Sequence, residues 1–144
     1  MKRNCLLLIL GVLLSVLAMS GCDVLDPALD GKWDPIQITV NGSRCKASTY
    51  RVPAEGGEFS LYSANYGSLW LNEVKENGRT VWPDNYNWQD YRSIHLTTDW
   101  YEVQYDHEGK LVVTISPIGE THTPRSLRFE VECGDAFGSI TFEQ

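Results

Sequence analysis

The sequence predicts an all-β fold in which short strands pair antiparallel, as in a β-sandwich or barrel. Runs of alternating apolar and polar residues recur along the chain, a pattern typical of half-buried strands. The pairs Asn41-Gly42 and Asn77-Gly78 stand between such runs, and Asn-Gly is a strong signal for a two-residue hairpin turn. No window of the domain has a helical period, so hairpins of short strands are the expected building blocks.

The strands expected in the first half are bounded by turn residues. Ile36, Ile38 and Val40 alternate with polar residues, which places them on one face of a strand. Pro53 ends the next run, and Gly56-Gly57 supplies backbone angles that other residues avoid. The strands expected here lie within residues 36–40, 47–52, 59–61, 69–74 and 80–82.

The second half continues the same pattern after an aromatic-rich stretch. Leu111, Val113 and Ile115 share one face of a strand, and the preceding segment 106–109 has the composition of a hairpin turn. Gly134-Asp135 predicts the last turn. The strands expected here lie within residues 100–105, 110–115, 127–131 and 139–142.

The N-terminal segment predicts a bacterial lipoprotein signal over residues 1–21. Lys2 and Arg3 precede an apolar run that ends at Met19, the order of a secretory signal. This run is shorter than the roughly 20 residues of a membrane-spanning helix. Residues 17–22, Leu-Ala-Met-Ser-Gly-Cys, resemble a lipobox, which makes Cys22 the expected lipid-bearing first residue. The alternative is a plain secretory signal followed by a chance cysteine.

The remaining chain divides into a tether over residues 22–34 and one domain over residues 35–144. The signal holds two of the 12 basic residues and none of the 19 acidic ones, so the mature chain has a formal charge of −9. An acidic chain repels phosphate backbones, which makes nucleic acid an unfavourable partner. The expected contact with the membrane runs through the lipid on Cys22.

Two cysteines remain in the domain, Cys45 and Cys133. Disulfides persist in the compartment to which the signal directs the chain. A bridge would close a long loop and, by restricting the unfolded chain, would stabilise the folded state by up to about 4–5 kcal/mol. Two free thiols are the equally weighted alternative, since spacing along the chain does not show whether the Cα atoms approach.

A set of short segments runs through the last two thirds of the chain: 52–57, 63–65 with Trp70, 99–100, 111–115, Arg125 and 138–144. In these segments the chain, from Tyr50 to Gln144, resembles the BACON domain, a Bacteroidetes-associated immunoglobulin-like β-sandwich. The stretch between Trp70 and Trp100 is longer and more aromatic than the family pattern. The resemblance implies that Trp70 and Trp100 fill the space between two sheets. It also implies either a carbohydrate or mucin role or service as a spacer.

The aromatic segment 82–92 is the candidate ligand site. Exposed tryptophan and tyrosine rings stack on the apolar faces of sugars, and arginine binds hydroxyl groups; the same residue types lead protein interfaces. The alternative is that these rings pack over an open edge of the sandwich. The expected ligand-binding residues are Trp82, Tyr86, Trp88, Tyr91 and Arg92.

Catalytic and metal-binding patterns are weak. His95, His107 and His122 are scattered and lack the spacing of a zinc pair. Glu130 and Glu132 alternate with apolar residues, which predicts a solvated strand face rather than a glycosidase pair. We therefore expect no catalytic residue, no metal and no cofactor.

Two hypotheses follow for a protein on the bacterial outer membrane, facing either the cell surface or the periplasm. The first is a lipid-anchored, non-catalytic binding or accessory protein that contacts a glycan or mucin. The second is a structural or assembly subunit of an envelope protein complex. Exposed rings in the 82–92 segment favour the first, whereas packed rings there and an apolar patch elsewhere favour the second.

Overall fold

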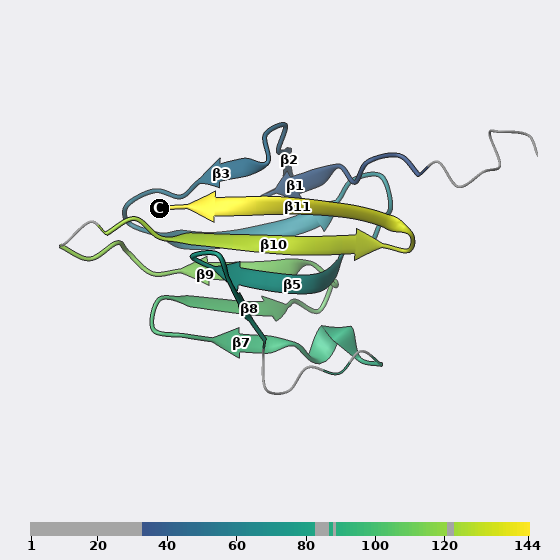
Figure 1. Cartoon of the computed structure of the whole chain (residues 1–144). Coiled ribbons are helices and arrows are strands. Elements are labelled where there is room, and N and C mark those ends of the chain that lie inside the picture. The colour runs from purple at the N-terminus through teal and green to yellow at the C-terminus, as the bar shows by residue number, and fades with distance from the viewer. Residues whose placement is uncertain (1–32, 83–86, 88, 121–122) are drawn as a thin grey trace, which may run out of the picture. The chain divides into compact units, whose positions relative to one another are not determined.

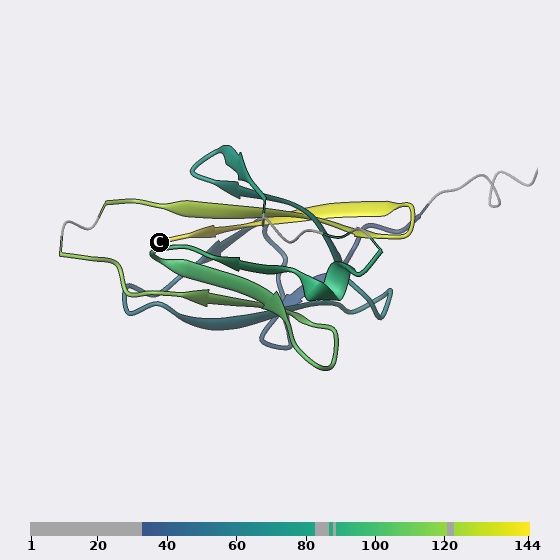
Figure 2. The same ribbon diagram turned by 90° about the horizontal axis from the view of Figure 1, so that it is seen from below.

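The computed structural model describes residues 33–82, 87, 89–120 and 123–144. Residues 34–144 form a compact unit of two β-sheets packed face to face (Figures 1 and 2). The fold is therefore all-β, an immunoglobulin-like β-sandwich, as the sequence predicts. Residues 1–32, which include the predicted signal (1–21), Cys22 and most of the predicted tether, lie outside the described residues.

The strands are short and follow one another along the chain, with one turn of 3₁₀ helix between two of them. Their bounds are β1 Ile38–Val40, β2 Ser43–Arg44, β3 Thr49–Arg51, β4 Gly57–Ser63, β5 Trp70–Glu76, β6 Arg79–Val81, η2 Tyr91–Ser93, β7 His95–Thr97, β8 Tyr101–Tyr105, β9 Leu111–Ile115, β10 Ser126–Cys133 and β11 Ala136–Glu143.

One sheet has the order β2-β1-β4-β9-β8-β7 and the other the order β3-β11-β10-β5-β6. The pairs are antiparallel except for β3 and β11, which run parallel. The chain leaves the edge strand β6 of the five-stranded sheet and enters the edge strand β7 of the other through η2. The aromatic segment therefore crosses from one sheet to the other along this side of the sandwich.

Both predicted Asn-Gly hairpin turns are confirmed. Asn41 and Gly42 have φ values of 50° and 77° and connect β1 to β2, while Asn77 and Gly78 have values of 47° and 81° and connect β5 to β6. Positive φ at both central residues gives the turn a twist that matches paired strands. These two sites set the register of both hairpins.

The core consists of the inward-facing residues of both sheets. Phe129 and Phe142 are almost fully buried and pack edge to face, with ring centroids 5.6 Å apart. Phe59 and Tyr50 continue this cluster, so the two sheets meet through aromatic rings near the middle of the strands. Glu130 and Glu132 alternate with the buried Phe129 and Val131 and face outward, as predicted.

The prediction that Trp70 fills the core is wrong. Its side chain is 36% exposed on the outer face of β5, whereas Leu69 and Leu71 on either side are buried. Strand alternation gives the inner face to the two leucines and leaves the tryptophan outside. Trp100 is half-buried and packs against the core from its margin.

Of the two alternatives that the sequence left open for Cys45 and Cys133, the structure has the free thiols rather than the bridge. The Cys45 thiol donates to the carbonyl oxygen of Ala47, and the Cys133 thiol donates to that of Ser68. Cys45 follows β2 at the edge of one sheet, whereas Cys133 ends β10 in the other. The two thiols therefore lie at different sheets, and each donates to a nearby carbonyl group.

Candidate functional site

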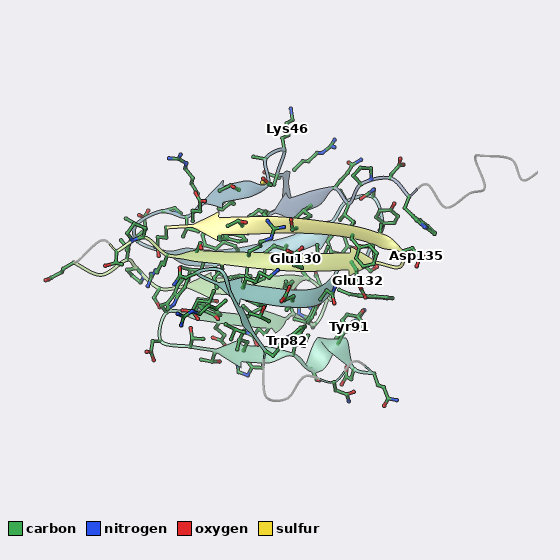
Figure 3. The ribbon with its side chains drawn as sticks, viewed as in Figure 1. Lys46, Trp82, Tyr91, Glu130, Glu132 and Asp135 are labelled. Carbon is green, nitrogen blue, oxygen red and sulfur yellow. The ribbon has the colours of Figure 1, made fainter. Side chains whose placement is uncertain are left out.

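The candidate ligand site is the segment between β6 and β7. Trp82 directly follows β6 and is 44% exposed. Tyr91 and Arg92 belong to η2, at the other end of the segment (Figure 3). Tyr86 and Trp88 lie outside the described residues.

Tyr91 is held by aromatic packing against both sheets. Its ring centroid lies 5.6 Å from that of Trp70 on β5 and 5.4 Å from that of Tyr105 on β8. The contact with Tyr105 is edge-to-face, with an interplanar angle of 83°, whereas the contact with Trp70 is tilted at 46°. Tyr91 therefore anchors η2 to both sheets. This is the packing alternative that the sequence left open for the aromatic rings of segment 82–92.

Tyr105, which contacts the Tyr91 ring, also links the two sheets directly. Its hydroxyl accepts a hydrogen bond from the backbone N–H of Leu71 at 2.8 Å and donates one to the carbonyl oxygen of Leu69 at 3.1 Å. Because Tyr105 belongs to β8 and Leu71 to β5, these bonds join the six-stranded sheet to the start of β5. These two hydrogen bonds fix the Tyr105 side chain against which Tyr91 packs.

Arg92 lies across Tyr91 rather than pointing freely into solvent. Its Nε donates to the Tyr91 hydroxyl at 3.1 Å, and its guanidinium carbon lies 5.6 Å from the ring centroid. The hydrogen bond to Tyr91 raises the pKa of Arg92. Gly109 lies close to the guanidinium, since a Cβ there would be 3.2 Å from Nη2. An exposed cation is thereby held at a fixed place beside the aromatic rings.

The outer face of the five-stranded sheet carries further exposed rings that sequence reasoning missed. Phe137 on β11 is 66% exposed and Trp70 is 36% exposed, and Glu132 on β10 is the register partner of both. Figure 3 shows Glu132 and Glu130 along β10, with Asp135 at the tip of the β10–β11 hairpin. The alternation of Leu69 and Leu71 around Trp70 was the available signal in the sequence.

Glu130 differs from Glu132 in being paired. Glu130 accepts a hydrogen bond from Arg128 Nε at 2.7 Å and lies 3.7 Å from Lys75 Nζ. Lys75 also pairs with Glu73 at 2.9 Å, and the pKa of Glu73 is lowered by the hydrogen bond from Thr80 and then by that from Lys75. These side chains neutralise one another on the sheet face, as surface ion pairs do.

A cleft of about 530 Å³ is lined by Arg125, Ser126 and Gln144 among others. Figure 1 shows the C-terminus at the end of the sandwich opposite η2. Arg125 in the wall of the cleft stacks on Trp100, with the guanidinium carbon 4.4 Å from the ring centroid. The same guanidinium donates to the carbonyl oxygens of Ser116 and Pro117. Burial lowers the pKa of Arg125, and its bonds are used within the fold.

The Gln144 side chain completes this arrangement. Its oxygen accepts from Arg125 Nε at 2.8 Å, and its amide nitrogen donates to the carbonyl oxygen of Pro53 at 2.7 Å. Three of the segments that resemble the BACON pattern, around residues 52–57, Arg125 and 138–144, therefore meet at one corner. Their contacts join chain segments to one another, so we assign them a structural role.

The described part of the chain contains few groupings of side chains that could bind a metal or perform acid–base chemistry. No group of three histidine, cysteine, aspartate or glutamate residues is arranged to hold a metal there. His95 on the edge strand β7 lies 2.6 Å from Glu102 on β8, and the Asp106 carboxylate accepts hydrogen bonds from two backbone N–H groups of its own turn. Among the described residues no helix is long and apolar enough to cross a membrane.

Comparison with known proteins gives one similar structure. No protein-family model matches the sequence, and no curated protein matches it. An NMR structure of a protein from Bacteroides thetaiotaomicron is 33% identical and superposes with a TM-score of 0.62. The match covers 86% of this chain and 96% of that chain.

Proposed function

We propose that this chain, which belongs to the same protein family as the Bacteroides thetaiotaomicron protein, is a membrane-anchored, non-catalytic binding or accessory lipoprotein. The lipobox-like sequence before Cys22 supports an anchor at that residue. A relative from Bacteroides is in keeping with the acidic Asp23 and Asp26, which resemble the export signals of surface lipoproteins in that phylum. The proposed location is the outer membrane, on its cell-surface or periplasmic face.

The proposed ligand is a glycan or mucin chain that contacts the segment between β6 and β7. The observation that carries this proposal is the 44% exposure of Trp82 in a segment whose other end is held rigidly by Tyr91. An exposed indole ring offers a face to the C–H groups of a sugar. Arg92, fixed on Tyr91, supplies hydrogen-bond donors to hydroxyl groups.

The test is a glycan and mucin binding screen with purified residues 23–144. These residues include the whole two-sheet core. Binding to a glycan is expected to be lost in Trp82→Ala, because this change removes an exposed ring that lies outside the buried core cluster. The same loss is expected in Trp88→Ala, which removes the second tryptophan of the segment. Phe137→Ala is the matched control, since it removes an exposed ring outside the candidate site, on β11.

Two results would reject the glycan proposal. One is the absence of binding to every glycan and mucin in the screen. The other is binding that Phe137→Ala weakens as much as Trp82→Ala, which would indicate general ring stickiness. Circular dichroism of each variant separates loss of a contact from loss of the fold.

A specific observation also favours the second candidate function, a structural or assembly role in an envelope protein complex. Phe137 and Trp70 are exposed on the flat outer face of β11 and β5, and large exposed apolar residues that gather on one face mark contact surfaces. Capture of an envelope protein by the wild-type chain, but not by Phe137→Ala, would favour this function.

A further inference from the structure

Three side chains form a row across the outer face of the five-stranded sheet. Trp70 on β5 is directly opposite Glu132 on β10, and Glu132 is directly opposite Phe137 on β11. Directly opposite residues of antiparallel strands point to the same face. The Glu132 carboxylate therefore stands between two aromatic rings, an arrangement that we call the outer-face row.

Both rings are accessible and the carboxylate lacks a cation of its own. Phe137 is 66% exposed and Trp70 is 36% exposed. Within the described part of the chain, Glu132 has no ion pair and no side-chain hydrogen bond, whereas Glu130 two residues earlier pairs with Arg128 and Lys75. The charge of Glu132 is thus available to a partner.

We propose that the outer-face row binds an arginine or lysine side chain presented by a protein partner in the envelope. Trp70 and Phe137 are separated by two inter-strand spacings, roughly 9.5 Å. A cationic side chain entering between them would lay its aliphatic stem against the rings and place its charge at Glu132. Such a cation gains from the carboxylate and from the faces of both rings.

Charge decides between this occupant and others. The mature chain carries a formal charge of −9, which steers basic partners toward it and repels anionic lipids and nucleic acid. Arginine suits the site best, because its planar guanidinium combines ring stacking with hydrogen bonds to a carboxylate. The inference deepens the assembly function above and does not depend on glycan binding at Trp82.

The experiment is a titration of isotopically labelled residues 23–144 with the pentapeptide Gly-Arg-Gly-Arg-Gly, followed by NMR. The neutral peptide Gly-Gln-Gly-Gln-Gly serves as the comparison ligand. We expect saturable shifts at the indole N–H of Trp70 and the amides of Glu132 and Phe137, with the arginine peptide only. Glu132→Gln should weaken binding about three- to fivefold, in the range of an exposed ion pair, and Phe137→Ala should weaken it as well.

Glu58→Gln is the matched control, because Glu58 is an exposed strand glutamate on the opposite sheet. Its binding should equal that of the wild type. If Glu58→Gln and Glu132→Gln weakened peptide binding equally, the net charge of the domain would explain the effect, which would overturn the proposal. So would shifts centred on Trp82, unchanged binding in Glu132→Gln, or equally tight binding of the neutral peptide.

The two proposals fail separately in these experiments. Glycan binding that depends on Trp82, together with no arginine binding at Glu132, would reject the outer-face row alone. Arginine binding without any glycan binding would reject the glycan proposal alone. Dispersed NMR spectra of the Glu132→Gln and Phe137→Ala variants confirm that each remains folded.

Discussion

Glycine is required at position 56 by two separate constraints. Its φ is +73°, and a Cβ there would lie 2.1 Å from the carbonyl oxygen of Ile115. Gly42 has a similar φ of +77°, but a Cβ there would meet nothing within 4 Å. The turn before β4 must therefore approach β9 more closely than any side chain allows.

Gly56→Ala is expected to destabilise the domain by more than about 2 kcal/mol, because it adds a backbone clash to the strain of a positive φ. Gly42→Ala should cost only about 1 kcal/mol, since it introduces the strain without the clash. Urea unfolding of both variants measures the difference. Equal losses of stability would show that the approach to Ile115 is unimportant.

The two thiols of the domain should differ in reactivity. Cys45 is half-buried and Cys133 is buried, and burial raises the pKa of the Cys133 thiol. Since the thiolate is the reactive form, we expect iodoacetamide to label Cys45 in the native domain and Cys133 only after unfolding. Mass spectrometry of residues 23–144 without added reductant would contradict the free thiols if neither cysteine were labelled in denaturant.

At the scale of elements, η2 and the residue that follows it pack against the sandwich. Ile94 is buried at its end, and Tyr91 packs against Trp70 and Tyr105. The Tyr105 hydroxyl satisfies two backbone groups at the start of β5. Contacts from both sheets thus hold η2, although the turn itself is too short to be stable alone.

Tyr105→Phe is expected to lower the free energy of unfolding by about 1–2 kcal/mol, because it leaves the Leu71 N–H and the Leu69 carbonyl without a partner. Tyr62→Phe is the control, since its hydroxyl donates only one bond, to the exposed Gly67. That change should cost less than about 1 kcal/mol. Chemical unfolding of the two variants gives the comparison, and similar costs would argue against the bridge between the sheets.

At the scale of the whole molecule, the sandwich is closed at its C-terminal end by Arg125 and Gln144. The backbone groups of these two residues exchange hydrogen bonds of 3.0 and 3.1 Å, and their side chains reach Pro53 and Ser116. Trp100 lies under Arg125 and donates to Glu76, which also accepts from Tyr101. Both sheets therefore meet in one hydrogen-bonded corner.

Because Tyr101 is part of this corner, we expect the domain to lose stability at alkaline pH. Burial, followed by the charge of Glu76, raises the pKa of Tyr101 above its ordinary value. A raised pKa stabilises the folded state below the unfolded value of about 10, and this contribution is lost as the pH rises through the folded value. The wild-type domain should lose stability above about pH 10, and Tyr101→Phe should lose less over the same range. Urea midpoints at pH 8 and pH 11 test this, and parallel decreases would contradict it.

The sequence by itself determined the local structure. Alternating apolar residues predicted most of the strands, and Asn41-Gly42 and Asn77-Gly78 predicted two hairpins, because both patterns act over a few residues. The outward direction of Glu130 and Glu132 followed from the same period. The position of Trp70 was also readable from Leu69 and Leu71, yet the family resemblance pointed to the core instead.

Only the tertiary structure decided which distant segments meet. The parallel pairing of β3 with β11, the separation of Cys45 from Cys133, and the row formed by Trp70, Glu132 and Phe137 depend on strand order and register. In the candidate site the sequence left exposure and packing of the rings open, and the structure has Trp82 44% exposed whereas Tyr91 packs against Trp70 and Tyr105. Packing between sheets joins residues far apart in the chain, and the local pattern of a single strand contains no information about its neighbours.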